Sequence, residues 1–183
     1  RLWRRRRLGR LVMADKALQA AHAARARADE KIAQVLPAAA LKRLQQCIAT
    51  GEQTHTGEMV LCIEASLPPS YVARGAPPRE RAITLFGKLR VWDTEANNGV
   101  LLYLLMEPHA IEVVADRALS RCVPQETWNR ITEHLAASLR SDAYEAGLHG
   151  ALESISALLA AHLERNIVVA DQVREGRGHM SLE

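Results

Sequence analysis

The chain has 183 residues, of which 48% are hydrophobic and 25% are charged, which is enough for one globular domain with a core but short for two. The formal net charge is +3, but six of the 24 Lys and Arg residues lie in the first ten positions, which hold no acid, so the rest carries 18 basic against 21 acidic residues. This mildly acidic body does not suit nucleic acid binding. The sequence contains no run of about 18 apolar residues, so no membrane span is predicted.

The chain begins with a basic stretch, Arg1 to Arg10, that reads "RLWRRRRLGR". It is either a solvated arm or a contact with an anionic membrane surface or a protein partner, because clustered Arg gains about 1 kcal/mol each near anionic lipid. Residues 15–36 are rich in Ala with a thin apolar stripe, which predicts a helix with little to bury. We therefore expect residues 1–36 to form a basic N-terminal arm and an Ala-rich helix outside the folded domain.

The domain is predicted to span residues 37–164. Leu41, Leu44 and Ile48 mark a first amphipathic helix that ends near Gly51. The segment 57–65, "GEMVLCIEA", predicts a strand that is buried on both faces because both of its faces are largely apolar. Residues 66–78 contain four Pro and are expected to be a loop.

A helical stripe then runs from Ala82 to Leu89, and the apolar run "GVLLYLL" predicts a second, central strand. Residues 110–116 predict a third strand, and two amphipathic helices follow at 128–139 and 144–163. Beyond Glu164, the charge and Gly content predicts a disordered C-terminal tail over residues 165–183.

The connections between the strands predict how the sheet is built. A helix joins the first two strands, so they should be parallel, whereas "EPH" between the second and third is too short for a crossover and predicts an antiparallel pair. The start of the first strand, residues 93–99 and Asp116 should therefore meet at one edge of a mixed, mostly buried sheet.

Carboxylate and amide oxygens gather at this predicted edge. Such oxygens are the ligands that Ca²⁺ and Mg²⁺ prefer, so we predict a divalent-cation site whose ligands are Asp93, Glu95, Asn98 and Asp116. The segment "DTEANNG" does not match a calcium-binding loop of the EF-hand type, because Gly99 stands at the seventh position and Leu104 at the twelfth. A plain helix-to-strand turn explains the same residues without an ion.

Other chemistry is sparse in the sequence. There is no Gly-rich phosphate loop, no nucleophile-elbow motif and no His pair at zinc spacing, so no catalytic residue is assigned. Cys47, Cys62 and Cys122 are odd in number and far apart, which is typical of a reducing compartment. We expect a cytoplasmic protein or one peripheral to the inner face of a membrane.

Four segments carry a resemblance to a known family. In order and spacing, "TGEMVLCIE", "WDTEANNGVLLYLL", "AIEVVADRAL" and "TWNRITEHLAASLRSDAYEAGLHGALESI" resemble the TPM domain family, formerly a domain of unknown function, and especially its short bacterial branch. The resemblance covers about Pro37 to Leu163. It implies an α/β fold, a three-layer α/β/α sandwich, which is consistent with the predicted elements.

The resemblance also implies candidate functions. Relatives include a thylakoid lumen protein linked to photosystem II repair and credited with acid phosphatase activity, membrane-tethered bacterial proteins, and members that bind divalent cations such as calcium. Many have "DNGV" where this chain has Asn97, Asn98 and Gly99, so one negative charge is missing here. We predict a non-enzymatic module that binds Ca²⁺ or Mg²⁺ at a membrane surface or in protein assembly, and the alternative is a metal-dependent, acid phosphatase-like hydrolase of phosphomonoesters.

Overall fold

A mixed β-sheet lies in the middle of the computed structural model, which describes residues 10–13 and 30–175, with side chains from 30 to 162. In these residues the spatial order of strands is β1 (Arg10–Met13), β2 (Met59–Ser66), β3 (Val100–Glu107) and β4 (Ala110–Ala115). β1, β2 and β3 are parallel and β4 is antiparallel to β3, which confirms the two predicted pairings. β1 was not predicted, because its four residues begin at the last Arg of the Arg-rich stretch.

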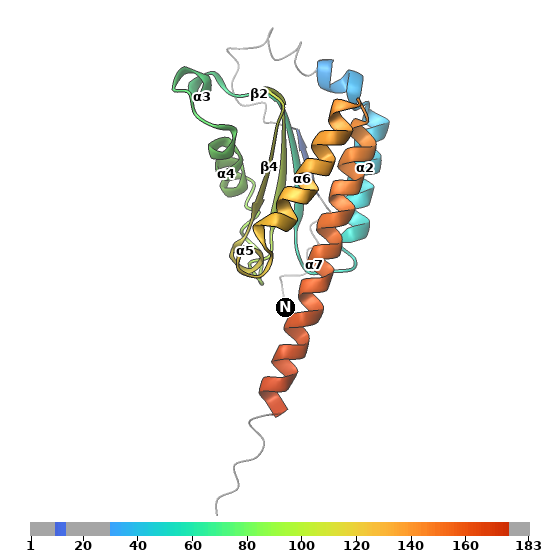
Figure 1. Ribbon diagram of the computed structural model, residues 1–183, viewed down its shortest axis with the longest axis vertical. Helices are drawn as coiled ribbons and strands as arrows, with labels where there is room; N and C mark the ends of the chain where they lie inside the picture. The colour runs from blue at the N-terminus through green and yellow to red at the C-terminus, as the bar shows by residue number, and fades with distance from the viewer. Residues whose placement is uncertain (1–9, 14–29, 176–183) are drawn as a thin grey trace, which may run out of the picture.

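Helices cover both faces of this sheet (Figure 1). One face carries α2 (Ala38–Gly51), α6 (Gln125–Arg140) and α7 (Tyr144–Glu175), and the other carries α4 (Pro78–Lys88), preceded by the short α3 (Pro69–Ala73). The chain is therefore an α/β protein with helices on either side of a mixed sheet, as predicted. α3 lies within the segment expected to be a loop, and α5 (Arg117–Cys122), which was not predicted, follows β4 at the edge of the sheet.

β2 and β3 form the buried centre of the sheet. Alternate residues of each strand point to opposite faces, and in both strands nearly all of them are buried. Leu61, Leu102 and Leu104 belong to the core beneath α2, α6 and α7, whereas Cys62 and Leu101 belong to the core beneath α4. The prediction that both strands are buried on two faces is confirmed.

The packed region begins before residue 37, and the last helix continues beyond residue 164. Residues 30–35 are helical, and Ile32 and Leu36 are buried in the main core, so this segment packs more tightly than its thin apolar stripe predicted. α7 runs to Glu175, past the start of the predicted tail. Nearly all of the predicted basic arm (1–9), most of the Ala-rich segment (14–29) and residues 176–183 lie outside the described residues. Within the described part, no helix has the length and hydrophobicity needed to span a bilayer.

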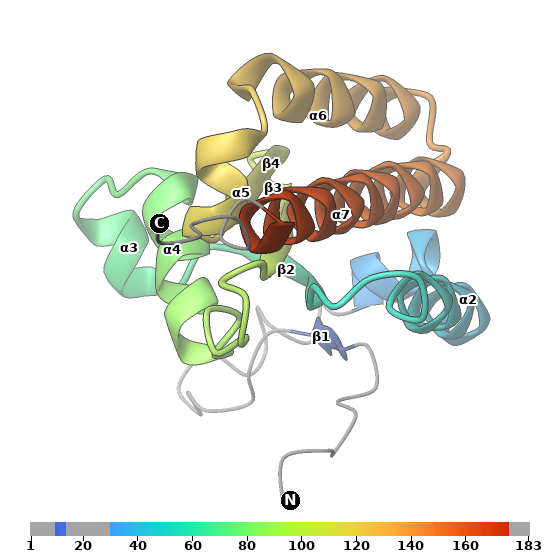
Figure 2. The ribbon, with the colours of Figure 1, turned by 90° about the horizontal axis from the view of Figure 1, so that it is seen from below.

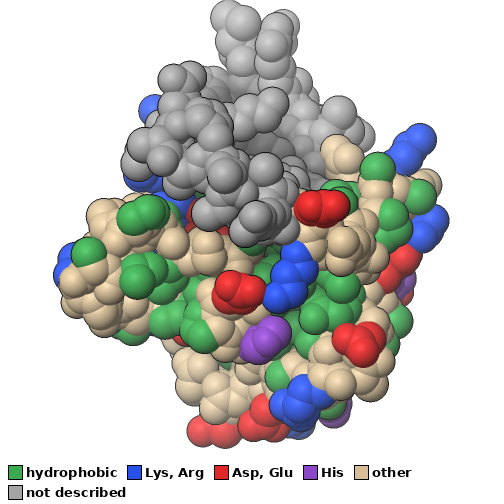
Figure 3. Space-filling view, turned by 90° about the horizontal axis from the view of Figure 1, so that it is seen from above, with side chains coloured by type: hydrophobic (Ala, Val, Ile, Leu, Met, Phe, Trp, Pro, Cys, Tyr) green, Lys and Arg blue, Asp and Glu red, His purple; other side chains and the backbone are tan. Residues whose placement is uncertain are grey.

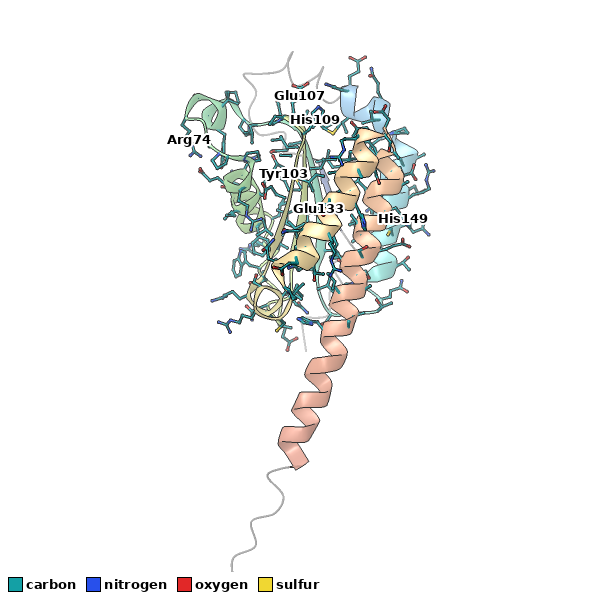
Figure 4. The ribbon with its side chains drawn as sticks, viewed as in Figure 1. Arg74, Tyr103, Glu107, His109, Glu133 and His149 are labelled. Carbon is teal, nitrogen blue, oxygen red and sulfur yellow. The ribbon has the colours of Figure 1, made fainter. Side chains whose placement is uncertain are left out.

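A buried charged network ties α4 to the sheet. Arg81 of α4 donates two hydrogen bonds to the carboxylate of Glu64 on β2, from Nε (2.9 Å) and from Nη2, and Tyr103 Oη on β3 donates a third at 2.7 Å. Figure 4 shows Tyr103 between the strands and α4. Burial raises the pKa of Tyr103 well above its usual value, and burial raises the pKa of the neighbouring Cys62 thiol to about 12. Both groups are therefore protonated at neutral pH, and the Cys62 thiol is unreactive.

Candidate functional site

Three segments that are distant in the sequence meet at the edge of the sheet where β2 and β3 begin, which is the lower edge in Figure 1 and faces the viewer in Figure 2. Val100 N donates to Glu58 O (2.9 Å), Asp116 N to Gly99 O (2.9 Å) and Ala118 N to Asn97 O (3.2 Å). These bonds join the start of β2, the loop 89–99 and the start of α5. The predicted meeting of these segments is confirmed.

The loop that enters β3 is a compact turn. α4 ends because Arg90 adopts a left-handed backbone conformation (φ 56°), and Val91 N reaches back to Phe86 O at 3.1 Å. Asn97 is also left-handed (φ 51°), a conformation that Asn tolerates well, and Asn98 N donates to Thr94 Oγ1 at 3.0 Å. The segment is thus the helix-to-strand turn that the sequence permitted.

The site combines two buried oxygens without a donor. Asn98 and Asp116 are 7% and 6% exposed, and in the described residues Asn98 Oδ1 and Asp116 Oδ2 have no hydrogen-bond partner. The other atoms of both side chains are used, since Asn98 Nδ2 donates to Thr56 Oγ1 (3.1 Å) and Asp116 Oδ1 accepts from Arg117 N (2.7 Å) at the start of α5. Buried acceptors of this kind require a donor, a water or a cation.

The other two predicted ligands lie differently. Asp93 and Glu95 are exposed on the outside of the turn. In the part of the chain that the structure describes, no three Asp, Glu, His or Cys side chains are close enough together to hold a metal ion. The edge therefore brings Asn98 and Asp116 to adjoining segments but leaves the acids of the turn at the surface. An ion here would take further oxygens from water, from the backbone or from a rearranged turn.

Sequence reasoning missed the residues that support the site. Thr56 and Thr94 hold Asn98 from two sides, and the signal that could have found Thr94 is a hydroxyl four residues before an Asn in a turn. His55 lies just behind, with 7% exposure, between Gly57 O (3.1 Å from Nδ1) and Ser156 Oγ of α7 (3.2 Å from Nε2). Because a carbonyl accepts, Nδ1 carries the proton and Nε2 accepts from the Ser156 hydroxyl.

The buried His55 makes stability depend on pH. Burial lowers the pKa of His55 below its ordinary value, so the unfolded chain binds a proton at a higher pH than the folded one. Its contribution is complete above pH of about 6.5 and decreases as the pH falls from there toward the folded pKa. As the pH falls through this range, the free energy of unfolding, measured by urea denaturation, should decrease less steeply in His55→Gln than in the original chain. The exposed His134→Gln should behave as the original chain, and an equal slope in all three would contradict the prediction.

A groove lies between α2 and α7, and Ser156, the partner of His55, is among its lining residues. Its volume is about 730 Å³. Its lining includes Cys47, Gly51, His149 and Glu153, and burial raises the pKa of the Cys47 thiol. A protonated thiol is a poor nucleophile, so the groove adds no reactive group to the candidate site.

Comparison with known proteins places these features in context. A family model described as "TPM domain" matches residues 30–158, more than half of the chain, which confirms the resemblance. No curated protein matches the sequence. Among solved structures, the chain is similar to the BA42 protein of the psychrophilic bacterium Bizionia argentinensis, with 20% identity, a TM-score of 0.59, and coverage of 71% of this chain and 81% of that one. It is also similar to the N-terminal domain of a P. gingivalis protein, with 21% identity, a TM-score of 0.58, and coverage of 72% and 81%. At these identities the two likenesses concern the fold alone.

Proposed function

The chain belongs to the TPM domain family, and on this basis we propose that it is a non-enzymatic module that binds Ca²⁺ or Mg²⁺ at the lower sheet edge and acts at a membrane surface or in protein assembly. One observation carries the proposal: two buried acceptor oxygens, Asn98 Oδ1 and Asp116 Oδ2, lack a donor within the described residues and lie on segments joined by backbone hydrogen bonds. A hard cation would be coordinated by both oxygens, and its positive charge would compensate the buried carboxylate.

The chemistry of the edge indicates weak binding. Asn98 supplies an oxygen without a charge, and Asp93 and Glu95 must leave their exposed positions to join Asp116 at one ion. We therefore expect a dissociation constant of roughly 10⁻⁴–10⁻³ M, the range of weak calcium modules.

Titration with Ca²⁺ should shift the backbone NMR signals of residues 93–99 and 116–118 together, because both segments would share one ion. The free energy of unfolding should rise by about 2.7 kcal/mol at a hundredfold excess over the dissociation constant. No shift in either segment, with an unchanged melting temperature, would leave residues 93–99 as a turn and nothing more.

Three variants separate a cation ligand from a structural residue. Asp116→Asn keeps the side-chain oxygen that caps α5, since Asn is as good an N-cap as Asp, but it should abolish the Ca²⁺ response. Asn97→Asp adds a charge at a left-handed position that Asp tolerates, so it should tighten binding. The matched control is Asp142→Asn, which changes an exposed, left-handed residue before α7 and should leave the titration unchanged.

The alternative function is metal-dependent hydrolysis of phosphomonoesters. It requires a metal-activated water or a nucleophile, together with positive charge for the phosphoryl oxygens. Arg117 and Arg90 lie on the segments of the edge and could supply that charge. Turnover of a generic phosphomonoester that disappears in Asp93→Ala and Asp116→Ala, while both variants stay folded, would favour this alternative over the binding module.

A further inference from the structure

Trp92 is held away from the core at the lower sheet edge. Its neighbour Val91 is fully buried, and Val91 O lies 1.9 Å from the position that a Cβ on Gly99 would occupy, so the backbone here is pressed against the start of β3. Trp92 itself remains 51% exposed. The tight packing on one side of the loop therefore presents a large aromatic ring to the solvent on the other.

Exposed basic residues lie on the two segments that meet at this edge. Lys88 and Arg90 precede it at the end of α4, and both are exposed. Arg117 and Arg121 are exposed on α5 and four residues apart, so they project from the same side of that helix. The bond from Ala118 N to Asn97 O joins α5 to the loop that carries Trp92. We name the five residues Lys88, Arg90, Trp92, Arg117 and Arg121 the edge surface.

The charge of this region depends on the cation. Residues 88–99 and 116–121 together hold four basic and three acidic residues, a net charge of +1. The three acids are Asp93, Glu95 and Asp116, which are the candidate ligands. A bound divalent cation would raise the net charge to +3, so occupancy would turn a nearly neutral edge into a cationic one.

We infer that the edge surface is a cation-dependent docking site for an anionic phospholipid membrane. The inference rests on the proposed function, because it uses the same ion. An exposed Trp beside Arg and Lys is the combination that lipid interfaces favour, since the ring lies at headgroup depth and each basic residue attracts anionic lipid.

Acidic and basic side chains also occur together at the opposite end of the molecule (Figure 3). Figure 3 shows it from above, with acidic and basic side chains interspersed over its visible part. α7 passes the lower edge on the other side of the sheet from α4, so a membrane docked on the edge surface would also meet that helix (Figure 1).

The test is co-sedimentation of the full chain with phosphatidylcholine vesicles, with and without phosphatidylserine, in Ca²⁺ or in a chelator. Binding should require both phosphatidylserine and Ca²⁺. Arg90→Gln and Arg117→Gln should each weaken it about fivefold, the effect of one basic residue at an anionic surface. Trp92→Ala should weaken it further, whereas Ile83→Ala, which removes an equally exposed apolar side chain from α4, and Arg140→Gln on α6 should not.

The outcomes separate this inference from the proposed function. If NMR shows Ca²⁺ binding but the vesicles do not bind, the docking inference fails and the proposed function stands. If vesicle binding is the same in the chelator, or if Trp92→Ala matches Ile83→Ala, the cation-dependent edge surface is wrong. If neither Ca²⁺ nor vesicles bind, both proposals fail, and a protein partner becomes the better explanation of the exposed ring.

Discussion

Replacing Arg81 by Met should lower the free energy of unfolding by about 3–5 kcal/mol, the cost of removing one partner from a buried ion pair. Glu64 is 4% exposed and receives two hydrogen bonds from Arg81, so among the described residues the variant leaves its buried carboxylate with the Tyr103 hydroxyl as the remaining donor. Urea denaturation of the original chain and the variant measures the difference.

Two further variants identify the cause of that loss. Glu64→Leu together with Arg81→Met removes both charges, and it should recover much of the stability because an apolar pair of similar volume can replace a buried ion pair. Arg74→Met, which breaks the exposed ion pair between Arg74, directly after α3, and Glu80 of α4, should have little effect because solvent screens that pair. A double variant as unstable as Arg81→Met alone would show that lost packing, and not the unpaired charge, causes the effect.

Replacing Gly99 by Ala should disrupt the entry to β3 and with it the candidate site. The new Cβ would lie 1.9 Å from Val91 O, a backbone atom that cannot rotate away, so the loop 89–99 must move. We expect a loss of about 1–3 kcal/mol or more, as in overpacked cores. Because the displaced loop carries Asn98, the response of residues 116–118 to Ca²⁺ should be lost as well.

Gly87→Ala is the matched control for that variant. Gly87 lies near the end of α4, and a Cβ there meets nothing within 4 Å. Ala is the better helix former, so this variant should be equal to the original chain or more stable by up to about 1 kcal/mol. Thermal unfolding compares the two substitutions, and equal melting temperatures would contradict the predicted close approach at Gly99.

Much of the architecture could be predicted from the sequence by itself. Apolar runs without alternation predicted β2 and β3 as strands buried on two faces, because such strands cannot present a polar face to water. The lengths of the connections predicted their pairing, since a parallel pair needs a crossover helix such as α4, whereas three residues suffice for an antiparallel turn. From these two steps the meeting of residues 93–99 with Asp116 followed.

Only the tertiary structure decided which residues of that edge are buried. From the sequence, Asp93, Glu95, Asn98 and Asp116 were equal candidates. In the structure, Asn98 is buried and donates hydrogen bonds to Thr94 and Thr56, whereas Asp93 and Glu95 remain exposed. Burial of this kind depends on contacts between segments that are distant in the sequence, such as Thr56 and Asn98, which no local pattern contains. The same holds for the bond between Glu64 and Tyr103, and for Ile32 and Leu36, whose burial depends on a core contributed by the rest of the chain.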